Sequence, residues 1–218
     1  TYCTNVHPGE SLADLDRILV EDVSTVKELV CPTDRFGAGL RLGNTIVNEL
    51  TASTHALERL AHRCHELDLY VFTVNGFPYG DFGSGTIKQT VYEPDWTQEA
   101  RVDYTIKLAE LMTRLPGPEH RTISTVAGGY GPDTVDLDTR RQMAKNLGRV
   151  ADHLSILSDR TGVQIRLCLE PEPWTTLETT PGAIEFFDQW IHPLGQYAER
   201  HLGLCYDCCH QAVYFEDM

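Results

Sequence analysis

Short runs with the composition of strands alternate along this chain with stretches in which apolar residues recur every three or four positions. The runs fall at residues 1–7, 39–42, 69–74, 121–126, 164–169 and 202–206. In the stretches between these runs, the spacing of apolar residues is typical of amphipathic helices. Examples are the segment that follows Ser11 and the segment from Leu50 to Leu67. Six strand-to-helix units in unbroken alternation predict a parallel sheet with helices outside it.

Capping and turn residues mark several of the expected helix ends. Asp95, followed three residues later by Gln98, resembles a capping box, so a helix is expected to start there. Gly162 is expected to end the helix that precedes the fifth strand. Thr180 and Pro181 supply a cap and a first helical turn for the next helix.

Such a sheet can have one of two arrangements, an open doubly wound sheet or a closed (β/α)8 barrel. Candidate polar residues follow several different strands rather than one switch point, and no glycine fingerprint follows the first strand. We therefore predict an α/β fold of the (β/α)8 TIM-barrel type. We expect residues 1–218 to form a single domain with about six of the eight units, truncated at the C-terminus, because a barrel typically needs about 250 residues.

Composition and charge narrow the classes of partner. The net charge of −14 predicts a surface that repels phosphate backbones, so nucleic acid is not expected as a partner. No run approaches the roughly 18 apolar residues needed to cross a bilayer. The chain begins with Thr1 and not with Met, so removal of a leader peptide is a further possibility. The odd number of cysteines, most of them within apolar patterns, indicates buried thiols in a reducing compartment and hence a cytoplasmic protein: Cys3, Cys31, Cys64, Cys168, Cys205, Cys208 and Cys209.

A pair of carboxylates follows directly on the fifth predicted strand. In the stretch Leu-Glu-Pro-Glu-Pro that ends at Pro173, each proline keeps the preceding residue out of helical geometry, so Glu170 and Glu172 are expected in extended backbone. A carboxylate that ends a buried strand is costly unless a cation or hydrogen-bond donors compensate it. Metal binding or catalysis by Glu170 is one interpretation. A salt bridge to Arg166 and a capping role for Glu172 are the alternatives.

A second acidic motif follows the sixth strand. Asp207 and His210 share one short turn, and if the fifth and sixth strands lie side by side, both side chains converge with the first glutamate on one hard or borderline cation. Cys205, Cys208 and Cys209, together with His210, raise the separate alternative of a structural zinc site. The sequence has no second Cys-x-x-Cys motif, which weighs against that alternative.

Three further residues are candidates for contacts with a substrate. His7 and Asn75 end predicted strands and could bind a substrate hydroxyl, although a histidine at a strand end is often a structural residue with satisfied hydrogen bonds. Lys88 lies in the long loop 75–94, whose aromatic and cationic composition suits a polar ligand. Simple packing of the loop is the alternative for Lys88 and its aromatic neighbours.

Six motifs resemble those of the family of the metabolite traffic protein EboE, which belongs to the xylose-isomerase-like, sugar-phosphate isomerase/epimerase-like TIM barrels. The resemblance extends over nearly the whole chain, and its motifs lie at Tyr2–His7, Leu69–Gly80, Val91–Trp96, Ile123–Val126, Leu169–Pro173 and Cys205–His210. The resemblance implies a barrel with a site on its carboxyl-terminal face. It implies less about the reaction, because this branch is named for a role in moving a metabolite.

Resemblance to the wider superfamily implies roles for three residues. Glu170 matches a metal-binding glutamate on the fifth strand, and Asp207 matches an aspartate on the sixth. His210 matches a histidine that contacts substrate in epimerases and metal in related endonucleases. The remaining ligands of the superfamily lie on strands seven and eight, for which this sequence has no equivalent.

The leading hypothesis from the sequence is a metal-dependent isomerase or epimerase of a small sugar-like or polyol-like metabolite. Glu170 would bind the metal and move a proton, Asp207 would bind the metal, and His210 would fix a substrate oxygen. Manganese, magnesium and zinc all suit this mixed set of oxygen and imidazole ligands. One alternative is a non-catalytic metabolite binder or carrier. Another is a metal-dependent endonuclease, against which the negative charge argues.

Overall fold

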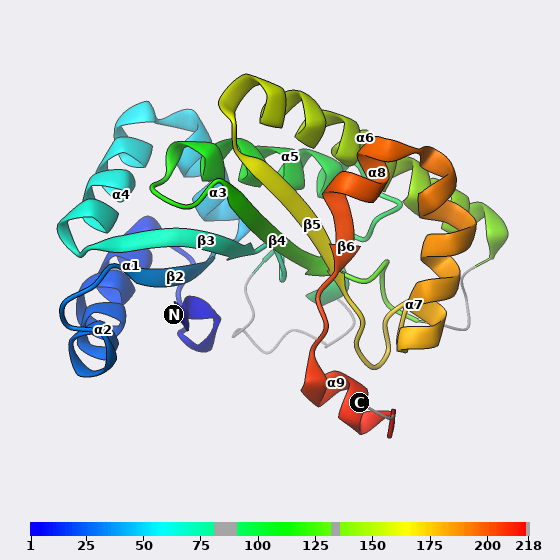
Figure 1. Ribbon diagram of the computed structural model, residues 1–218, viewed down its shortest axis with the longest axis horizontal. Helices are drawn as coiled ribbons and strands as arrows, with labels where there is room; N and C mark the ends of the chain where they lie inside the picture. The colour runs from blue at the N-terminus through cyan, green and yellow to red at the C-terminus, as the bar shows by residue number, and fades with distance from the viewer. Residues whose placement is uncertain (81–90, 132–135, 217–218) are drawn as a thin grey trace.

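Six strands form one parallel sheet, in the order in which they follow along the chain (Figure 1). The computed structural model describes residues 1–80, 91–131 and 136–216. Strands that pair sequentially and in parallel form the wall of a TIM barrel, so the predicted α/β fold of this type is confirmed as a partial barrel of six strands. The strands are β1 Tyr2–Cys3, β2 Phe36–Arg41, β3 Leu69–Asn75, β4 His120–Val126, β5 Gln164–Glu170 and β6 Leu202–Leu204.

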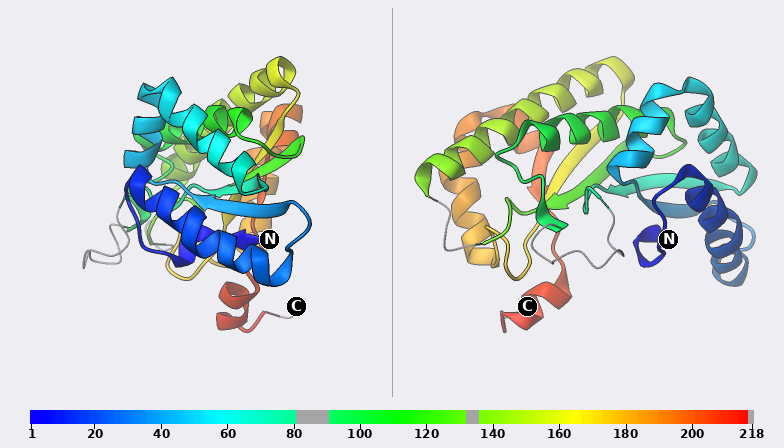
Figure 2. Two further views of the ribbon diagram at one scale, coloured as in Figure 1. Left: turned by 90° about the vertical axis from the view of Figure 1, so that its left-hand side faces the viewer. Right: turned by 180° about the vertical axis from the view of Figure 1, so that it is seen from behind.

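Helices connect successive strands and cover the outside of the sheet. In the view from behind, α5 and α6 lie across it (Figure 2). The α-helices are α1 Leu12–Arg17, α2 Ser24–Val30, α3 Asn44–Ala52, α4 Thr54–Glu66, α5 Glu99–Arg114, α6 Leu137–Thr161, α7 Thr180–Phe186, α8 Gln196–His201 and α9 Cys208–Val213. Short 3-10 turns occupy Thr4–Val6 and His192–Leu194, and π-helical turns occupy Ile18–Val23 and Phe187–Ile191. None of the described helices has both the length and the apolar composition needed to cross a membrane.

The two faces of the sheet differ in polarity, as the alternation of side chains along a strand requires. In β4 and β5, Ile123, Leu167 and Leu169 are fully buried beneath the helices. The alternate positions turn toward the barrel interior, where the Thr122 hydroxyl lies 2.7 Å from that of Thr73 on β3. The apolar core therefore lies between sheet and helices.

The first strand is shorter than the sequence predicted. Only Tyr2–Cys3 pairs with β2, and the chain then forms a 3-10 turn at Thr4–Val6. The hydroxyl of Thr4 accepts a hydrogen bond from the backbone N–H of Arg41 at 2.8 Å. The Thr4 side chain thus satisfies a backbone N–H of β2 that a longer β1 would have bound through a backbone carbonyl.

One expected helix start was wrong, a second was confirmed except for its cap residue, and one helix end was confirmed. The Asp95 carboxylate accepts from the backbone N–H of Thr97 at 2.8 Å, which makes a local turn, and α5 begins only at Glu99. Pro181 lies in the first turn of α7 as predicted, but the cap is the Thr179 hydroxyl, one residue earlier than expected. Gly162 ends α6 in left-handed geometry, with φ of 74°, as predicted.

The helical segments also differ in continuity from the expectation. The segment after Ser11 is one continuous helical stretch, but a π-helical turn interrupts its α-helical geometry. The helix expected between Leu50 and Leu67 is two helices, because Ser53 adopts extended geometry and caps α4 by accepting from the N–H of Ala56 at 3.2 Å.

Replacement of Gly128 is expected to destabilise the protein. Gly128 follows β4 with φ of 93°, and a Cβ atom there would lie 2.5 Å from Cβ of Thr176. We expect Gly128→Ala to lower the free energy of unfolding by about 2 kcal/mol or more, from backbone strain plus overpacking. Gly162→Ala is the matched control, because Gly162 also has positive φ but no atom within 4 Å of the added Cβ, so only about 1 kcal/mol should be lost. Equal losses in urea denaturation would contradict this account.

Candidate metal centre

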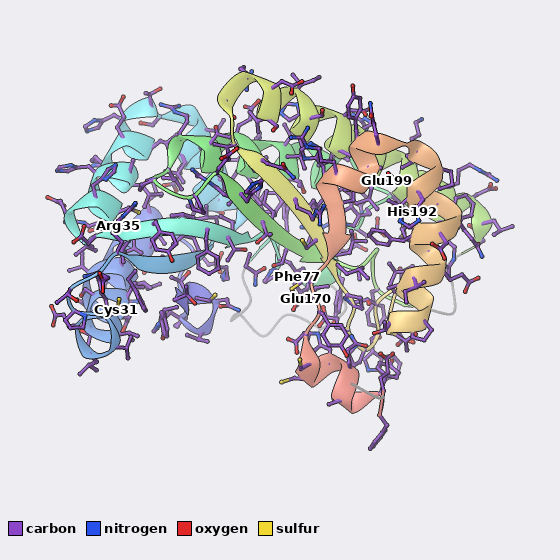
Figure 3. All side chains as sticks on the ribbon, viewed as in Figure 1. Cys31, Arg35, Phe77, Glu170, His192 and Glu199 are labelled. Atoms are coloured by element: carbon purple, nitrogen blue, oxygen red, sulfur yellow. The ribbon has the colours of Figure 1, made fainter. Side chains whose placement is uncertain are left out.

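Glu170 ends β5 at the carboxyl edge of the sheet. The residues before it, Leu167 to Leu169, are buried, and Pro171 ends the strand immediately after it. The Glu170 side chain therefore emerges at the mouth of the partial barrel, where Figure 3 labels it near Phe77. The thiol of Cys205, at the end of β6, donates a hydrogen bond to the Glu170 carboxylate.

Asp207 reaches the same edge from the neighbouring strand. Its Oδ1 atom caps α9, accepting from the backbone N–H of Cys209 at 2.7 Å and of His210 at 3.2 Å. This cap starts a helix directly after β6, so His210 on the first turn of α9 lies beside Asp207. The second carboxylate oxygen, Oδ2, lies 3.8 Å from Nε2 of His210.

The three residues converge on one point. One ligand atom from each of Glu170, Asp207 and His210 lies within 4.8 Å of the other two. Ligand atoms that share one ion at about 2.0–2.2 Å lie at most about 4 Å apart, so small side-chain rotations suffice to bring them to a cation. Sequence reasoning proposed this set, and the geometry is compatible with it.

The electrostatics of the cluster favour the presence of a cation. Burial raises the pKa of the Glu170 carboxyl, and the charge of Asp207 adds to the rise, whereas His210 and the Cys205 thiol act against it. Burial also raises the pKa of the nearby Glu172 to about 7, against the opposing effect of His210. Three partly buried carboxylates therefore lie close together with no arginine or lysine paired to them among the described residues.

The chemistry of the donor set fits a divalent ion. Two carboxylates and an imidazole are ligands that magnesium, manganese and zinc accept to different degrees. In addition, Nδ1 of His210 is buried and has no hydrogen-bond partner within the described part of the chain. An imidazole with an unused nitrogen beside two carboxylates is expected where a ligand completes the site. Glu170, Asp207 and His210 would hold the ion.

A cavity of about 720 Å³ opens beside the cluster. Glu172 and the three cluster residues form one wall of it. The opposite wall comes from the loop after β1 and from the ends of β2 and β3, including Asn5, His7, Glu10, Arg41, Asn75 and Phe77. The cavity thus connects the candidate metal centre to polar side chains from three other strands.

The predicted substrate-binding residues are placed differently from one another. His7 lines the cavity, but both ring nitrogens are engaged, Nε2 with the Tyr2 hydroxyl at 2.9 Å and Nδ1 near the Asp22 carboxylate at 3.5 Å. Asn75 lines the cavity too, and its Oδ1 atom accepts from the backbone N–H of Phe77 at 3.0 Å, which leaves its amide N–H groups to donate. Lys88 lies outside the described residues.

The alternatives that the sequence left open find little support in the geometry. Arg166 is exposed and donates to the carbonyl of Arg200 at 3.2 Å instead of pairing with Glu170. Cys208 and Cys209 are exposed, and no cysteine belongs to the group of possible metal ligands found among the described residues. Neither the salt bridge nor the zinc site of Cys-x-x-Cys type therefore accounts for the cluster.

Two features of the site escaped sequence reasoning. Glu10 lines the cavity from the loop after β1, and its position next to Pro8 and Gly9 at the end of the first strand was the available signal. The Cys205 thiol contacts Glu170, and burial raises the pKa of that thiol to about 12. The sequence places Cys205 in the strand pattern and in the zinc alternative, but a thiol inside an apolar run gives no sign that its partner is Glu170.

Glu172 is expected to make the metal-free protein less stable as the pH rises. Its pKa of about 7 lies above the unfolded value of 4.5, so the folded protein binds the extra proton and stability falls between about pH 4.5 and pH 7. Relative to wild type, Glu172→Gln should be equally stable near pH 4 and more stable by about 2–3 kcal/mol near pH 8. Urea denaturation in EDTA measures this difference, and a gap that is independent of pH would contradict it.

The match to a protein family covers most of the chain. Residues 37–218 match the family described as "Xylose isomerase-like TIM barrel". A search of curated proteins finds no match. The match is to this broad family, and the narrower resemblance to EboE stays a prediction.

Several solved structures have a fold similar to that of this chain, among them the following three. The probable 3-DHS dehydratase AsbF involved in petrobactin synthesis from Bacillus anthracis has 15% identity and a TM-score of 0.58, over 99% of this chain and 65% of that one. A xylose isomerase-like TIM barrel protein from Mycobacterium smegmatis in complex with magnesium has 12% identity and a TM-score of 0.56, over 95% and 66%. The IolI protein with a bound zinc atom has 16% identity and a TM-score of 0.51, over 95% and 63%.

These likenesses concern the fold alone, since each identity is below one residue in five. The chain spans slightly less than two thirds of the length of these three structures. Two of them hold a divalent metal, which is a property of those proteins.

Proposed function

Because this chain belongs to the xylose isomerase-like TIM barrel family, we propose that its cavity binds a divalent metal and that it isomerises or epimerises a small sugar-like or polyol-like metabolite. The observation that carries the proposal is the convergence of Glu170, Asp207 and His210 within 4.8 Å beside a cavity of about 720 Å³. Membership of the narrower EboE group belongs to this proposal as well.

Each residue of the cluster has a part in the proposed reaction. Glu170 and Asp207 hold the metal, and Asp207 does so with Oδ2 because Oδ1 is committed to the cap of α9. Glu170 also moves a proton to or from the substrate carbon, and His210, the third ligand, also fixes a substrate oxygen. A bound divalent cation supplies Lewis-acid polarisation of a carbonyl in such reactions. In the opposite wall of the cavity, the free amide N–H groups of Asn75 orient the hydroxyl groups of the substrate.

Exchange of a substrate proton with solvent tests the proposal directly. We expect the manganese-loaded protein to catalyse deuterium incorporation next to the carbonyl in at least one member of a panel of ketoses and cyclic polyhydroxy ketones in D2O, followed by proton NMR. EDTA and Glu170→Gln should both abolish the exchange. Glu28→Gln, which removes one exposed carboxylate from α2, should leave it unchanged.

The result also decides between the enzyme and a non-catalytic carrier. Metal binding with saturable binding of a panel member but no exchange would contradict the isomerase proposal and favour the carrier. Exchange that persists in EDTA would contradict the metal-dependent mechanism.

A further inference from the structure

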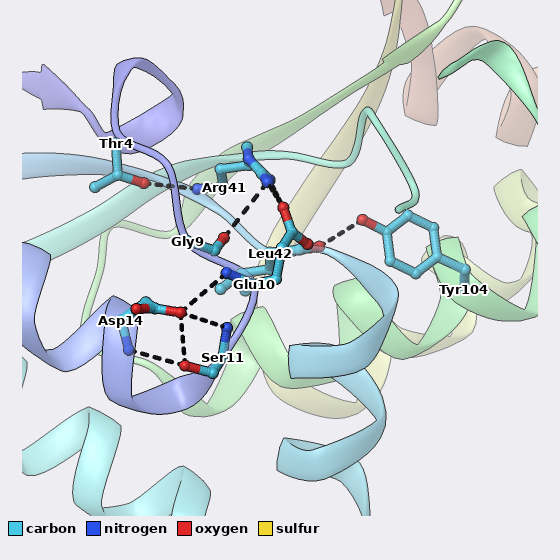
Figure 4. Close-up of polar contacts among 8 residues, drawn as sticks. All are labelled: Thr4, Gly9, Glu10, Ser11, Asp14, Arg41, Leu42 and Tyr104. Atoms are coloured by element: carbon cyan, nitrogen blue, oxygen red, sulfur yellow. Dashed lines mark hydrogen bonds and ion pairs between the residues drawn. The ribbon is translucent and has the colours of Figure 1, made fainter. Parts of the chain in front are cut away.

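An ion pair lies in the wall of the cavity opposite the candidate metal centre. Arg41 ends β2 with its side chain only 8% exposed, and its guanidinium contacts the Glu10 carboxylate through both terminal nitrogens, with Nη1 at 3.0 Å from Oε1 (Figure 4). The same guanidinium donates to the carbonyl of Gly9 at 3.4 Å. Both charged residues line the cavity.

The backbone around this pair holds it in place. The hydroxyl of Thr4 accepts from the Arg41 backbone N–H at 2.8 Å, and the Asp14 carboxylate accepts from the Glu10 backbone N–H at 3.2 Å. Asp14 also forms the capping box of α1 with Ser11, which joins the Glu10 loop to the start of that helix. The pair is therefore built into the loop and strand that carry it (Figure 4).

The charge balance of the cavity disfavours an anionic ligand. Among the described lining residues, Arg41 is the one arginine or lysine, and Glu10 neutralises it. The other charged residues of the wall are the carboxylates Glu170, Glu172 and Asp207. A phosphate or carboxylate ligand is bound by positively charged hydrogen-bond donors that have no other ion-pair partner. In this cavity it would compete with Glu10 for Arg41 and would be repelled by three further carboxylates.

The same wall suits hydroxyl groups. The amide N–H groups of Asn75 are free to donate, and the second oxygen of Glu10 adds an acceptor. Phe77 and Pro78 contribute apolar surface beside these groups. Mixed donors, acceptors and a flat apolar surface fit the hydroxyls and the C–H face of an uncharged polyhydroxylated molecule.

We propose that Glu10, by neutralising Arg41, is a specificity-determining residue that makes this cavity bind uncharged hydroxyl-bearing ligands and reject phosphorylated or carboxylated ones. This inference rests on the proposed function for its choice of substrate class. The role of Glu10 in excluding anions can be tested without any metal.

Inorganic phosphate is the probe. With EDTA-treated protein at low ionic strength, calorimetry should detect no saturable phosphate binding to wild type up to about 10 mM, whereas Glu10→Gln should bind phosphate with a millimolar Kd because Arg41 is released. The double variant Glu10→Gln/Arg41→Gln should lose that binding. Glu28→Gln has the same change in net charge as Glu10→Gln at an exposed site, and it should behave as wild type.

Two outcomes would overturn the proposal. One is submillimolar phosphate binding by wild type that Arg41→Gln abolishes, which would make Arg41 an anion clamp. The other is phosphate binding to Glu10→Gln that is no tighter than to wild type or to Glu28→Gln. Circular dichroism and thermal melting establish whether each variant is folded. If Glu10→Gln is unfolded, Glu10→Ala serves as a second variant in which Arg41 has lost its ion-pair partner. Because metal is absent throughout, failure of the metal-centre proposal leaves this result unaffected.

Discussion

Asp207→Asn is expected to lower the affinity for a divalent metal by about 100-fold or more while leaving the stability of the fold nearly unchanged. Asparagine keeps the Oδ1 acceptor that caps α9 through the N–H groups of Cys209 and His210, and it is as good a cap as aspartate. In aspartate, the second oxygen, Oδ2, lies 3.8 Å from Nε2 of His210 and carries negative charge. Asparagine has an uncharged amide nitrogen in its place. Calorimetric titration with manganese and urea denaturation measure the two effects separately.

The chain offers a matched control for this substitution. Asp136 caps α6 in the same way, accepting from the N–H of Thr139 at 2.8 Å, but it is exposed and does not belong to the cluster. Asp136→Asn should leave metal affinity unchanged. Asp207→Ala should lose both metal affinity and about 1 kcal/mol of stability, because the cap is removed. Metal binding by Asp207→Asn that equals wild type would contradict the assignment of this carboxylate.

Trp96→Ala is expected to cost about 3–5 kcal/mol of stability, the largest loss that we expect from a single substitution in this core. Trp96 is fully buried, and its indole N–H donates to the carbonyl of Val126 at 3.1 Å. Its backbone N–H donates to Gly128 at 3.0 Å, and its carbonyl accepts from the Asn146 side chain at 2.9 Å. Trp96 therefore joins the start of α5 to the end of β4 and to α6.

Trp96→Phe separates packing from hydrogen bonding at this position. Phenylalanine keeps most of the buried ring but removes one of two donors to the Val126 carbonyl, which still accepts from the backbone N–H of Gly128 at 3.0 Å, so we expect a loss of only about 1–2 kcal/mol. Urea unfolding followed by far-ultraviolet circular dichroism is the suitable measurement, because fluorescence would change with the indole itself. A loss of less than about 1 kcal/mol in Trp96→Ala would show that the core repacks around the cavity.

The fold was predictable from the sequence because its signal is periodic. The strand and helix patterns identified six parallel strands, and Gly162 marked the end of α6 as expected. The details that failed are those in which one side chain displaces a regular pattern. Thr4 replaces a strand partner of Arg41, and Ser53 divides the helix expected between Leu50 and Leu67.

The site was predictable only in part, for a related reason. Glu170, Asp207 and His210 could be proposed because each follows an apolar strand, and parallel strands bring such residues to the same edge of the sheet. Their role as metal ligands stays a prediction. The pairing of Glu10 with Arg41 joins the loop after β1 to the end of β2, and nothing in the local pattern of either residue specifies the other.

The position of Trp96 shows how composition misleads about a loop. The aromatic neighbours of Lys88, in the loop 75–94 and just after it, suggested ligand contacts, and Phe77 of that loop does line the cavity. Trp96 instead belongs to the buried core. Aromatic residues serve packing and recognition equally well, so only their position in the folded chain separates the two uses.

The presence of a divalent-metal site at Glu170 and Asp207 is the central claim, and calorimetry combined with elemental analysis tests it most directly. Wild type and Glu170→Ala/Asp207→Ala would each be titrated with manganese, magnesium and zinc. The account predicts one equivalent of at least one of these metals in wild type and none in the variant. Absence of stoichiometric metal in wild type, or its retention in the variant, would contradict the account.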